Sequence, residues 1–258
     1  MSIYSKVLHD WGDRRTSGRR WLMGLLSLSM VTVTIPVTAQ RSPTTLQDVN
    51  GHWAQLCIQH LYRRKVVTGY PDQTFRPNEP VTRTEFAAML DRAFPEVPDR
   101  NTQRQYDDLD ETYWGLIPIY RATQTGFMQG YPDGTFAPTK NIPRYEVLLA
   151  LVSGLNYSPQ GDPQSIIRQY YEDANLLPQF AYRAIAAATE QQLVVNYPNV
   201  RQLQPKQWAS RAEVASFLCR ALETTGTVPT QYIVGGDRPK PIQKQFPQPA
   251  TIPNLEGR

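Results

Sequence analysis

One unit recurs three times along this chain, and that recurrence constrains the fold more than any other feature. The same number of residues separates Trp53 from Gly69 in the first copy and Trp114 from Gly130 in the second. Equal spacings also join Phe75 to Glu85 and Phe136 to Glu146. A unit of this size cannot bury its apolar face alone, so the copies are expected to share one core.

The third copy is more divergent than the first two. Phe180 stands where the first copy has Trp53, and Asn196 stands where it has Gly69. The motif regains its register at Arg211. We place the copies at residues 46–95, 104–157 and 169–223, with a short extra helix at 164–170.

Each copy is predicted to hold two helices joined by a turn, so the fold is expected to be mainly α. In the first copy, residues 53–66 read as a helix, and Gly69 supplies the backbone freedom needed to leave it. The apolar stripes predicted for this helix and for the three second helices are Leu56, Cys57, Leu61 and Val66; Phe86, Met89, Leu90 and Ala93; Val147, Leu148 and Leu151; and Val214, Phe217 and Leu218. With three copies, closed packing about a pseudo-threefold axis is favoured over an open solenoid.

The predicted helix starts carry recognisable capping residues. Thr82 and Glu85 match a capping box, and Ser210 and Glu213 repeat it. Pro143 breaks the pattern in the second copy, because proline has no capping side chain. Asp162 and Pro163 are suited to begin the extra helix.

These motifs together resemble the S-layer homology repeat. The resemblance rests on Asp48, Trp53-Ala54, Gly69-Tyr70-Pro71-Asp72, Phe75-Arg76-Pro77 and Thr82-Arg83-Thr84-Glu85-Phe86, and on the same pattern in the second copy. It covers residues 46–223 and implies a three-pronged spindle with grooves between the prongs. It also implies a ligand, because such repeats hold secondary cell-wall polymers, often bearing pyruvate ketals, through an arginine and a groove aromatic.

The arginine near the start of each second helix is the main candidate site residue. Arg83, Arg144 and Arg211 would add a fork of donors to the positive end of a helix dipole, and we expect them to face outward toward an anion. The alternative is that each one pairs with a nearby Asp or Glu and only fastens the repeat. The other glycan-binding candidates are Trp53, Trp114, Gly69, Gly130, Tyr70 and Tyr131.

Three further residue sets have a more structural interpretation. We expect Phe180 to pack in the core, and the third-copy groove to be weakened or purely structural. Asp48, Asp108 and Asp173 are expected to cap the first helix or the turn before it. Cys57 and Cys219 lie on apolar helix faces, where buried thiols fit; export would also permit a disulfide, and sequence alone does not fix the pairing.

The first 39 residues have the composition of a secretory leader. A basic segment is followed by an apolar run and then by Val37-Thr38-Ala39, a small-residue pattern typical of cleavage. We therefore expect export to the periplasm, cell wall or cell surface, with no membrane span once the leader is removed; the alternative is that the apolar run is retained as a membrane anchor. Of the formal net charge of +4, this segment contributes +3. The remainder lacks the basic excess expected of a nucleic-acid binder.

The chain does not carry an enzyme-like set of residues. No nucleophile–base pattern stands out, and His9, His52 and His60 have no metal-ligand spacing, so neither a metal nor a cofactor is expected. Residues 224–258 are proline-rich and are predicted to form a flexible tail that could contact an envelope protein. We therefore expect a non-catalytic protein that binds cell-wall polysaccharide; the alternative is a protein–protein adaptor without glycan binding.

Overall fold

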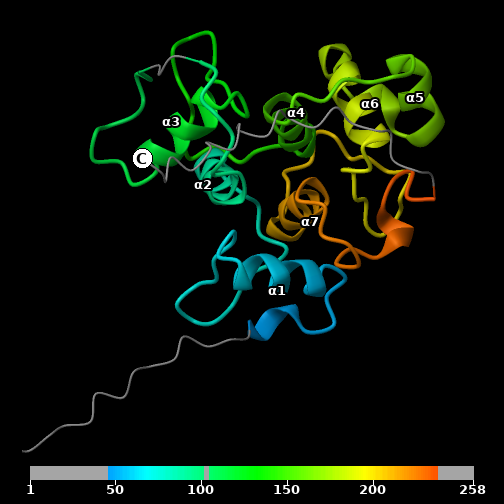
Figure 1. Cartoon of the computed structure of the whole chain (residues 1–258), viewed down its shortest axis with the longest axis horizontal. Helices are drawn as coiled ribbons and strands as arrows, with labels where there is room; N and C mark the ends of the chain where they lie inside the picture. Colours follow the sequence, from blue (N-terminus) through cyan, green and yellow to red (C-terminus); the bar gives the residue numbers. More distant parts are fainter. Residues whose placement is uncertain (1–45, 102–104, 238–258) are drawn as a thin grey trace, which may run out of the picture. The chain divides into compact units, whose positions relative to one another are not determined.

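The fold is built from α-helices, as predicted. A computed structural model describes residues 46–101 and 105–237, and within them it has helices and isolated bridges but no β-strand (Figure 1). The helices are α1 (Gln55–Arg63), α2 (Arg83–Ala93), α3 (Leu116–Gln124), α4 (Arg144–Gly154), α5 (Pro163–Tyr170), α6 (Tyr182–Glu190) and α7 (Arg211–Ala221). Short 3-10 helices are η1 (Gln47–Val49), η2 (Ala174–Leu176), η3 (Gln179–Ala181) and η4 (Thr230–Tyr232).

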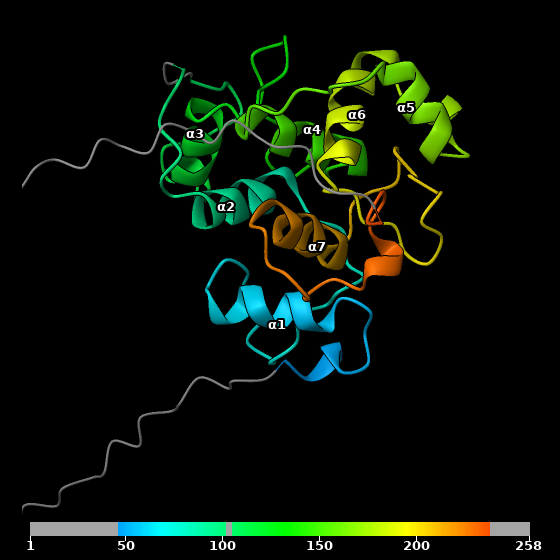
Figure 2. The same cartoon turned by 45° about the vertical axis from the view of Figure 1, so that its right-hand side comes forward.

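The helices pair between repeats and not within them. The second helix of the first repeat, α2, packs against α3 of the second repeat, and α4 of the second packs against α6 of the third (Figures 1 and 2). The first helix of the chain, α1, packs against the last, α7. The added helix α5 lies against α6. Each repeat thus gives one helix to each of two neighbours, which is how the three copies share a core.

Three hydrogen bonds close the repeats into a ring. The backbone N–H of Val81 donates to the carbonyl of Ala209 at 3.0 Å. The N–H of Ile142 donates to Val81, and that of Ala209 to Ile142, both at 2.9 Å. All three residues are buried. These contacts have the closed, pseudo-threefold character expected from the repeats, while the outline of a three-pronged spindle stays a prediction.

The aspartates at equivalent positions of the three repeats do not cap helices as expected. They stabilise the turns instead. Each carboxylate accepts two backbone N–H groups, one of them from a residue with positive φ. The pairs are Asp48 with Phe75 and Arg76, Asp108 with Phe136 and Ala137, and Asp173 with Leu203 and Gln204, at 2.6–2.9 Å. Arg76, Ala137 and Gln204 have φ of 60°, 54° and 50°. The ionic hydrogen bonds offset the cost of that left-handed backbone in all three copies.

The predictions for the starts of α2, α4, α5 and α7 are confirmed. Thr82 with Glu85, and Ser210 with Glu213, form complete capping boxes at α2 and α7. Pro143 makes no side-chain cap on α4. Asp162 accepts the N–H of Ser165 at the start of α5, with Pro163 in the first turn.

The buried faces of the helices agree with the predicted stripes except at one position. Every predicted second-helix residue is buried, as are Cys57, Leu61 and Val66. Leu56, in contrast, is 59% exposed, because α1 contacts its neighbours through a narrower face than the stripe suggested.

Gly69 has a different role from the predicted one. Helix α1 ends at Arg63, and the residue with positive φ after it is Lys65. At Gly69 a Cβ would come within 2.6 Å of Leu46 Cδ2, and at Gly130 within 2.2 Å of Tyr106 Cε1. A Cβ would also lie 3.0 Å from Thr74 O at Gly69 and 2.8 Å from Thr135 O at Gly130, so glycine avoids close contacts within each turn.

Cys57 and Cys219 form a disulfide between α1 and α7, with Cα atoms 6.2 Å apart. This settles the alternative that the sequence left open. The bond joins the first and third repeats, which meet without a direct chain connection.

The expected flexible tail differs from the structure over its first part. Residues 224–237 are described, and within them Val228, Ile233 and Val234 are buried. Ile233 forms a bridge with Val195 of the third repeat. The leader at residues 1–39 and the rest of the tail, 238–258, lie outside the described residues. None of the helices in the described ranges is long and apolar enough to cross a bilayer.

Candidate functional site

The three motif arginines do not face outward, so that prediction is wrong. Arg83, Arg144 and Arg211 are 5%, 1% and 5% exposed. Each lies at the first position of its helix, α2, α4 or α7, where the adjoining turn of the next repeat covers it. A buried guanidinium must find partners for its N–H groups, and these arginines find them in backbone oxygens.

Each arginine fastens its own repeat to the turn of the following one. Arg83 donates through Nε to Phe136 O and through Nη2 to Gln129 O, both at 2.7 Å. Arg211 makes the equivalent bonds to Phe75 O and Thr68 O, also at 2.7 Å. Arg144 binds Leu203 O at 2.8 Å and Asn196 Oδ1 at 2.6 Å. These contacts agree with the alternative in which the arginines fasten the repeats, although the main partners are backbone oxygens and not Asp or Glu side chains.

The arginines differ in their acidic partners. Arg83 Nη1 lies 3.3 Å from Glu146 Oε2, and Arg144 Nη1 lies 2.5 Å from Glu213 Oε1. Arg211 has no carboxylate within ion-pair distance among the described residues. Burial lowers the pKa of Arg211, but a guanidinium stays charged near neutral pH. Arg211 is thus the motif arginine with a positive charge that no ion pair offsets.

Equivalent side chains form three grooves between the repeats, two of them open and the third filled, and every groove draws on all three copies. One repeat supplies the arginine, the next supplies the turn tyrosine, and the third supplies an aromatic near the start of its first helix. We name each groove by that last residue. The Phe180 groove has Arg83 and Tyr131, the Trp114 groove has Arg211 and Tyr70, and the Trp53 groove has Arg144 and Tyr197.

The Phe180 groove has a cavity of about 510 Å³, a size typical of ligand sites. Phe180 is 71% exposed, so the prediction that it packs in the core is wrong. Its ring lies edge-on to Tyr145 at 6.1 Å. The Tyr145 hydroxyl donates to Glu146 Oε1 at 3.1 Å. Burial, together with the Glu146 charge, raises the pKa of Tyr145 to about 12, so this hydroxyl stays a donor.

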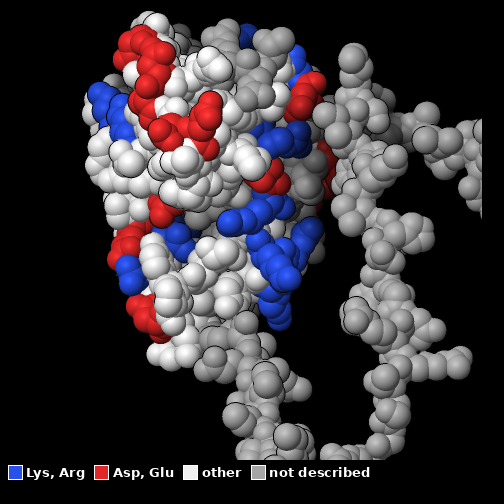
Figure 3. All heavy atoms as spheres, turned by 90° about the vertical axis from the view of Figure 1, so that its left-hand side faces the viewer, with Lys and Arg blue, Asp and Glu red and all other residues white. Residues whose placement is uncertain are grey.

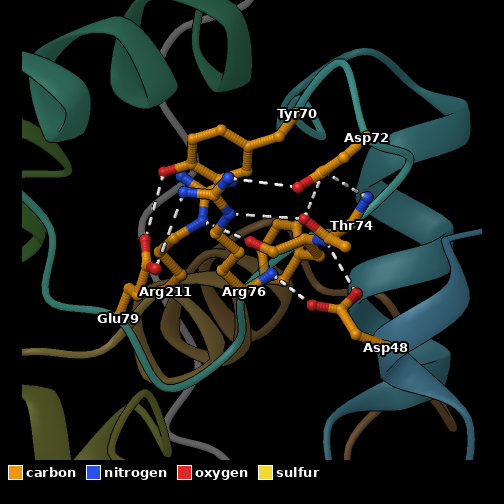
Figure 4. A network of polar contacts seen from close by, with 8 residues as sticks. Asp48, Tyr70, Asp72, Thr74, Arg76, Glu79 and Arg211 are labelled. Carbon is orange, nitrogen blue, oxygen red and sulfur yellow. Dashed lines mark hydrogen bonds and ion pairs between the residues drawn. The ribbon is translucent and has the colours of Figure 1, made fainter.

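The Trp114 groove is smaller, about 160 Å³, and more polar. Trp114 is 62% exposed at its edge. Figure 4 shows the wall that Arg211 forms with Tyr70, whose ring lies 5.1 Å from the Arg211 guanidinium carbon. The Arg76 guanidinium carbon lies 3.8 Å from the same ring, and burial raises the pKa of Tyr70.

The Trp53 groove is closed. Trp53 is half-buried and stacks on Tyr197, with ring centroids 5.2 Å apart and planes at 9°. Tyr232 from η4 packs edge-on against both rings, and Tyr197 keeps 44% of its surface exposed. Trp53 and Arg144, both predicted site residues, therefore belong to this filled groove. The expectation of a weakened or structural third-copy groove rested on Asn196 and Phe180: Asn196 lies in the filled groove, but Phe180 lines an open one.

Two backbone donors next to the groove tyrosines are unused. Among the described residues, the N–H groups of Gly69 and Gly130 have no hydrogen-bond partner. Gly69 lines the Trp114 groove, whereas Gly130 adjoins Tyr131 and Gln129 of the Phe180 groove without lining it. Each open groove therefore combines an aromatic face, a tyrosine and a turn held by a buried arginine. Such a set can hold a polar ring with an apolar face, and no group of metal-ligating side chains is found in the described part of the chain.

Sequence reasoning found most of these residues but assigned none of them to a particular groove. It gave no sign that Trp114 lines the groove of Gly69 and Arg211, which belong to the other two repeats. It did not identify Phe180, Tyr145 or Arg92 as groove residues. The signal for Phe180 was present, since it occupies the position of Trp53 and Trp114.

The fold and grooves define a module built from three repeats. The chain carries S-layer homology domains: the S-layer homology domain model matches residues 46–87 and 105–147. The third repeat takes equivalent positions in the ring of hydrogen bonds described above.

The curated relatives share only part of their length with this chain. It is 27% identical to an amylopullulanase of Thermoanaerobacterium thermosulfurigenes over 86% of this chain and 12% of the relative. It is 30% identical to a cellulosome-anchoring protein of Acetivibrio thermocellus over 46% of this chain and 28% of the relative. It is 24% identical to the S-layer protein EA1 of Bacillus anthracis over 80% and 23%.

Proposed function

We propose that this chain is a non-catalytic envelope protein that attaches to cell-wall polysaccharide through the Phe180 and Trp114 grooves. The main support is that, in both grooves, an exposed aromatic lies across from a turn that carries a tyrosine and is held by a buried arginine. Exposed aromatics in concave sites are typical of binding surfaces, since a sugar ring that covers them removes apolar surface from water.

The comparisons with known proteins support a role at the cell surface. Two relatives are named for S-layer formation and for cellulosome anchoring, both roles at the cell surface. The enzymes among the relatives share only a small part of their length with this chain, as the 12% for the amylopullulanase illustrates. Location at the cell wall or cell surface follows from the same proposal.

The groove chemistry suits a saccharide. An aromatic ring can lie against the apolar face of a sugar, while the N–H of Gly69 or Gly130 donates to a ring substituent. The buried arginines act as positioning residues, because they fix the turn that presents the glycine and the tyrosine. Two grooves on one chain would also let a long polymer bind at both, which raises the overall affinity.

Phe180→Ala and Trp114→Ala should each weaken binding to purified sacculi by about tenfold, which corresponds to about 1.4 kcal/mol. Both side chains are exposed, so the free energy of unfolding should change little. Trp208→Ala is the matched control, because Trp208 is also exposed but lines neither open groove. Binding is measured by co-sedimentation with sacculi over a range of protein concentrations.

If neither groove variant changes sedimentation, the grooves are not the binding surface. If the unaltered chain ignores sacculi but captures an envelope protein, the adaptor alternative is correct. Arg83→Ala is a poor test, since it removes buried bonds that hold the repeats together.

The two open grooves differ in charge, and their ligands should differ accordingly. The Trp114 groove is lined by Arg92 and Arg211, whereas the position equivalent to Arg92 in the Phe180 groove is Ser153. Figure 3 shows that one face of the molecule carries both signs, with basic side chains grouped near its centre. We propose that an acidic sugar substituent binds in the Trp114 groove and a neutral sugar in the Phe180 groove.

Arg92→Ser should therefore reduce the salt dependence of sacculus binding, and Ser153→Arg should increase it. The reason is that each change removes or adds one exposed cation beside a groove. Arg64→Ser is the control, since Arg64 is exposed but lines neither open groove. Binding is compared at low and high sodium chloride. Equal slopes for all variants would contradict the assignment of the acidic group.

A further inference from the structure

The Trp53 groove is filled by a segment of the chain that no repeat contains. Tyr232, the last residue of η4, places its ring edge-on to both walls of this groove. Its centroid lies 6.2 Å from that of Trp53, with planes at 75°, and 4.9 Å from that of Tyr197, with planes at 81°. In the other two grooves, the equivalent walls border an open cavity.

The segment also accepts a hydrogen bond from the turn N–H whose equivalents in the other two repeats are unpaired. The N–H of Asn196 donates to the carbonyl oxygen of Tyr232 at 2.9 Å. Asn196 is the third-repeat equivalent of Gly69 and Gly130, whose N–H groups have no partner in the described residues. Tyr232 thus supplies both elements that a saccharide would supply: an acceptor oxygen for the turn and a ring surface for the aromatics.

The contact is anchored on both sides of Tyr232. Val228, Ile233 and Val234 are buried. The Val234 N–H donates to Val194 O at 3.0 Å, and the Gln192 side chain donates to Gly235 O at 2.8 Å. The segment is therefore part of the folded module, and the ring of Tyr232 is held in place by main-chain contacts that do not depend on that ring.

We infer that Tyr232 is an internal occupant of a third saccharide groove, so that the chain offers two open grooves and removal of this ring opens the third. The inference rests on the proposed function for the class of ligand. The occupancy itself can be tested without any ligand.

The test uses protein labelled with 5-fluorotryptophan, with each 19F resonance assigned by Trp→Phe substitution. Without ligand, Tyr232→Ala should shift the Trp53 resonance and enlarge its solvent isotope shift, while Trp114 and Trp208 stay unchanged. Tyr232→Phe is the matched control, since it keeps the ring and should leave Trp53 as it is. An unchanged Trp53 resonance in Tyr232→Ala would overturn the occupancy, whatever the protein binds.

In the second arm, the labelled proteins are titrated with polysaccharide released from sacculi. We expect Trp114 to respond in every variant, and Trp53 to respond only in Tyr232→Ala. The inference is overturned if Trp53 responds in the unaltered protein at the concentrations that move Trp114. It is also overturned if Trp53 stays silent in Tyr232→Ala while Trp114 responds. No response at any tryptophan would contradict saccharide binding in the Trp114 groove, and the ligand-free arm would still decide the occupancy.

Discussion

Arg144→Ala should lower the free energy of unfolding by about 3–5 kcal/mol, the range observed when one partner of a buried ion pair is removed. Arg144 is 1% exposed and pairs with Glu213, so its loss leaves a poorly hydrated carboxylate without its cation. Leu203 O and Asn196 Oδ1 lose their donor as well. The effect is measured by urea unfolding followed by circular dichroism.

The control for this prediction is Arg201→Ala. Arg201 also forms an ion pair, with Glu172, but both side chains are about half exposed, and the change should cost less than about 1 kcal/mol. Adding Glu213→Gln to Arg144→Ala should recover part of the loss, because it removes the uncompensated charge. Equal destabilisation by Arg144→Ala and Arg201→Ala would mean that Arg144 does not hold the repeats together.

Breaking the disulfide should lower the free energy of unfolding by about 2–5 kcal/mol. Cys57 and Cys219 are separated by 162 positions in the sequence, so the bond restricts a long stretch of the unfolded chain. The double variant Cys57→Ser with Cys219→Ser and the reduced protein should show similar losses in urea unfolding. Alkylation and mass measurement under denaturing conditions establish whether the bond is present in the oxidised sample. Free thiols in the exported protein, or equal stability with and without reductant, would contradict this prediction.

The helices, caps and core were predictable because they depend on local pattern. Periodicity located the buried faces of α2, α4 and α7, and the capping box located the start of two of these helices. Leu56 was the exception, since periodicity cannot tell how wide a buried face will be.

The grooves were less predictable because they depend on which repeats meet. The position of Arg83, Arg144 and Arg211 at helix starts was correct, but the turn that covers each one comes from the next repeat. The exposure of Phe180 and the partial burial of Trp53 also depend on which distant segments of the chain lie beside each residue. Equivalent residues face an open cavity in one groove and the Tyr232 segment in another. The proline-rich composition of residues 224–258 predicted a flexible tail. The buried pair Ile233-Val234 was missed because so short an apolar segment shows no periodicity.

The exchange of helices around the ring also fixes the number of copies. In an open solenoid, a repeat can be gained or lost at either end, since each unit contacts only its neighbours. Here α1 already has its partner in α7, so an inserted fourth unit would have to separate them, and a deleted one would leave two helices unmatched. Variation within this architecture must therefore proceed by remodelling individual grooves.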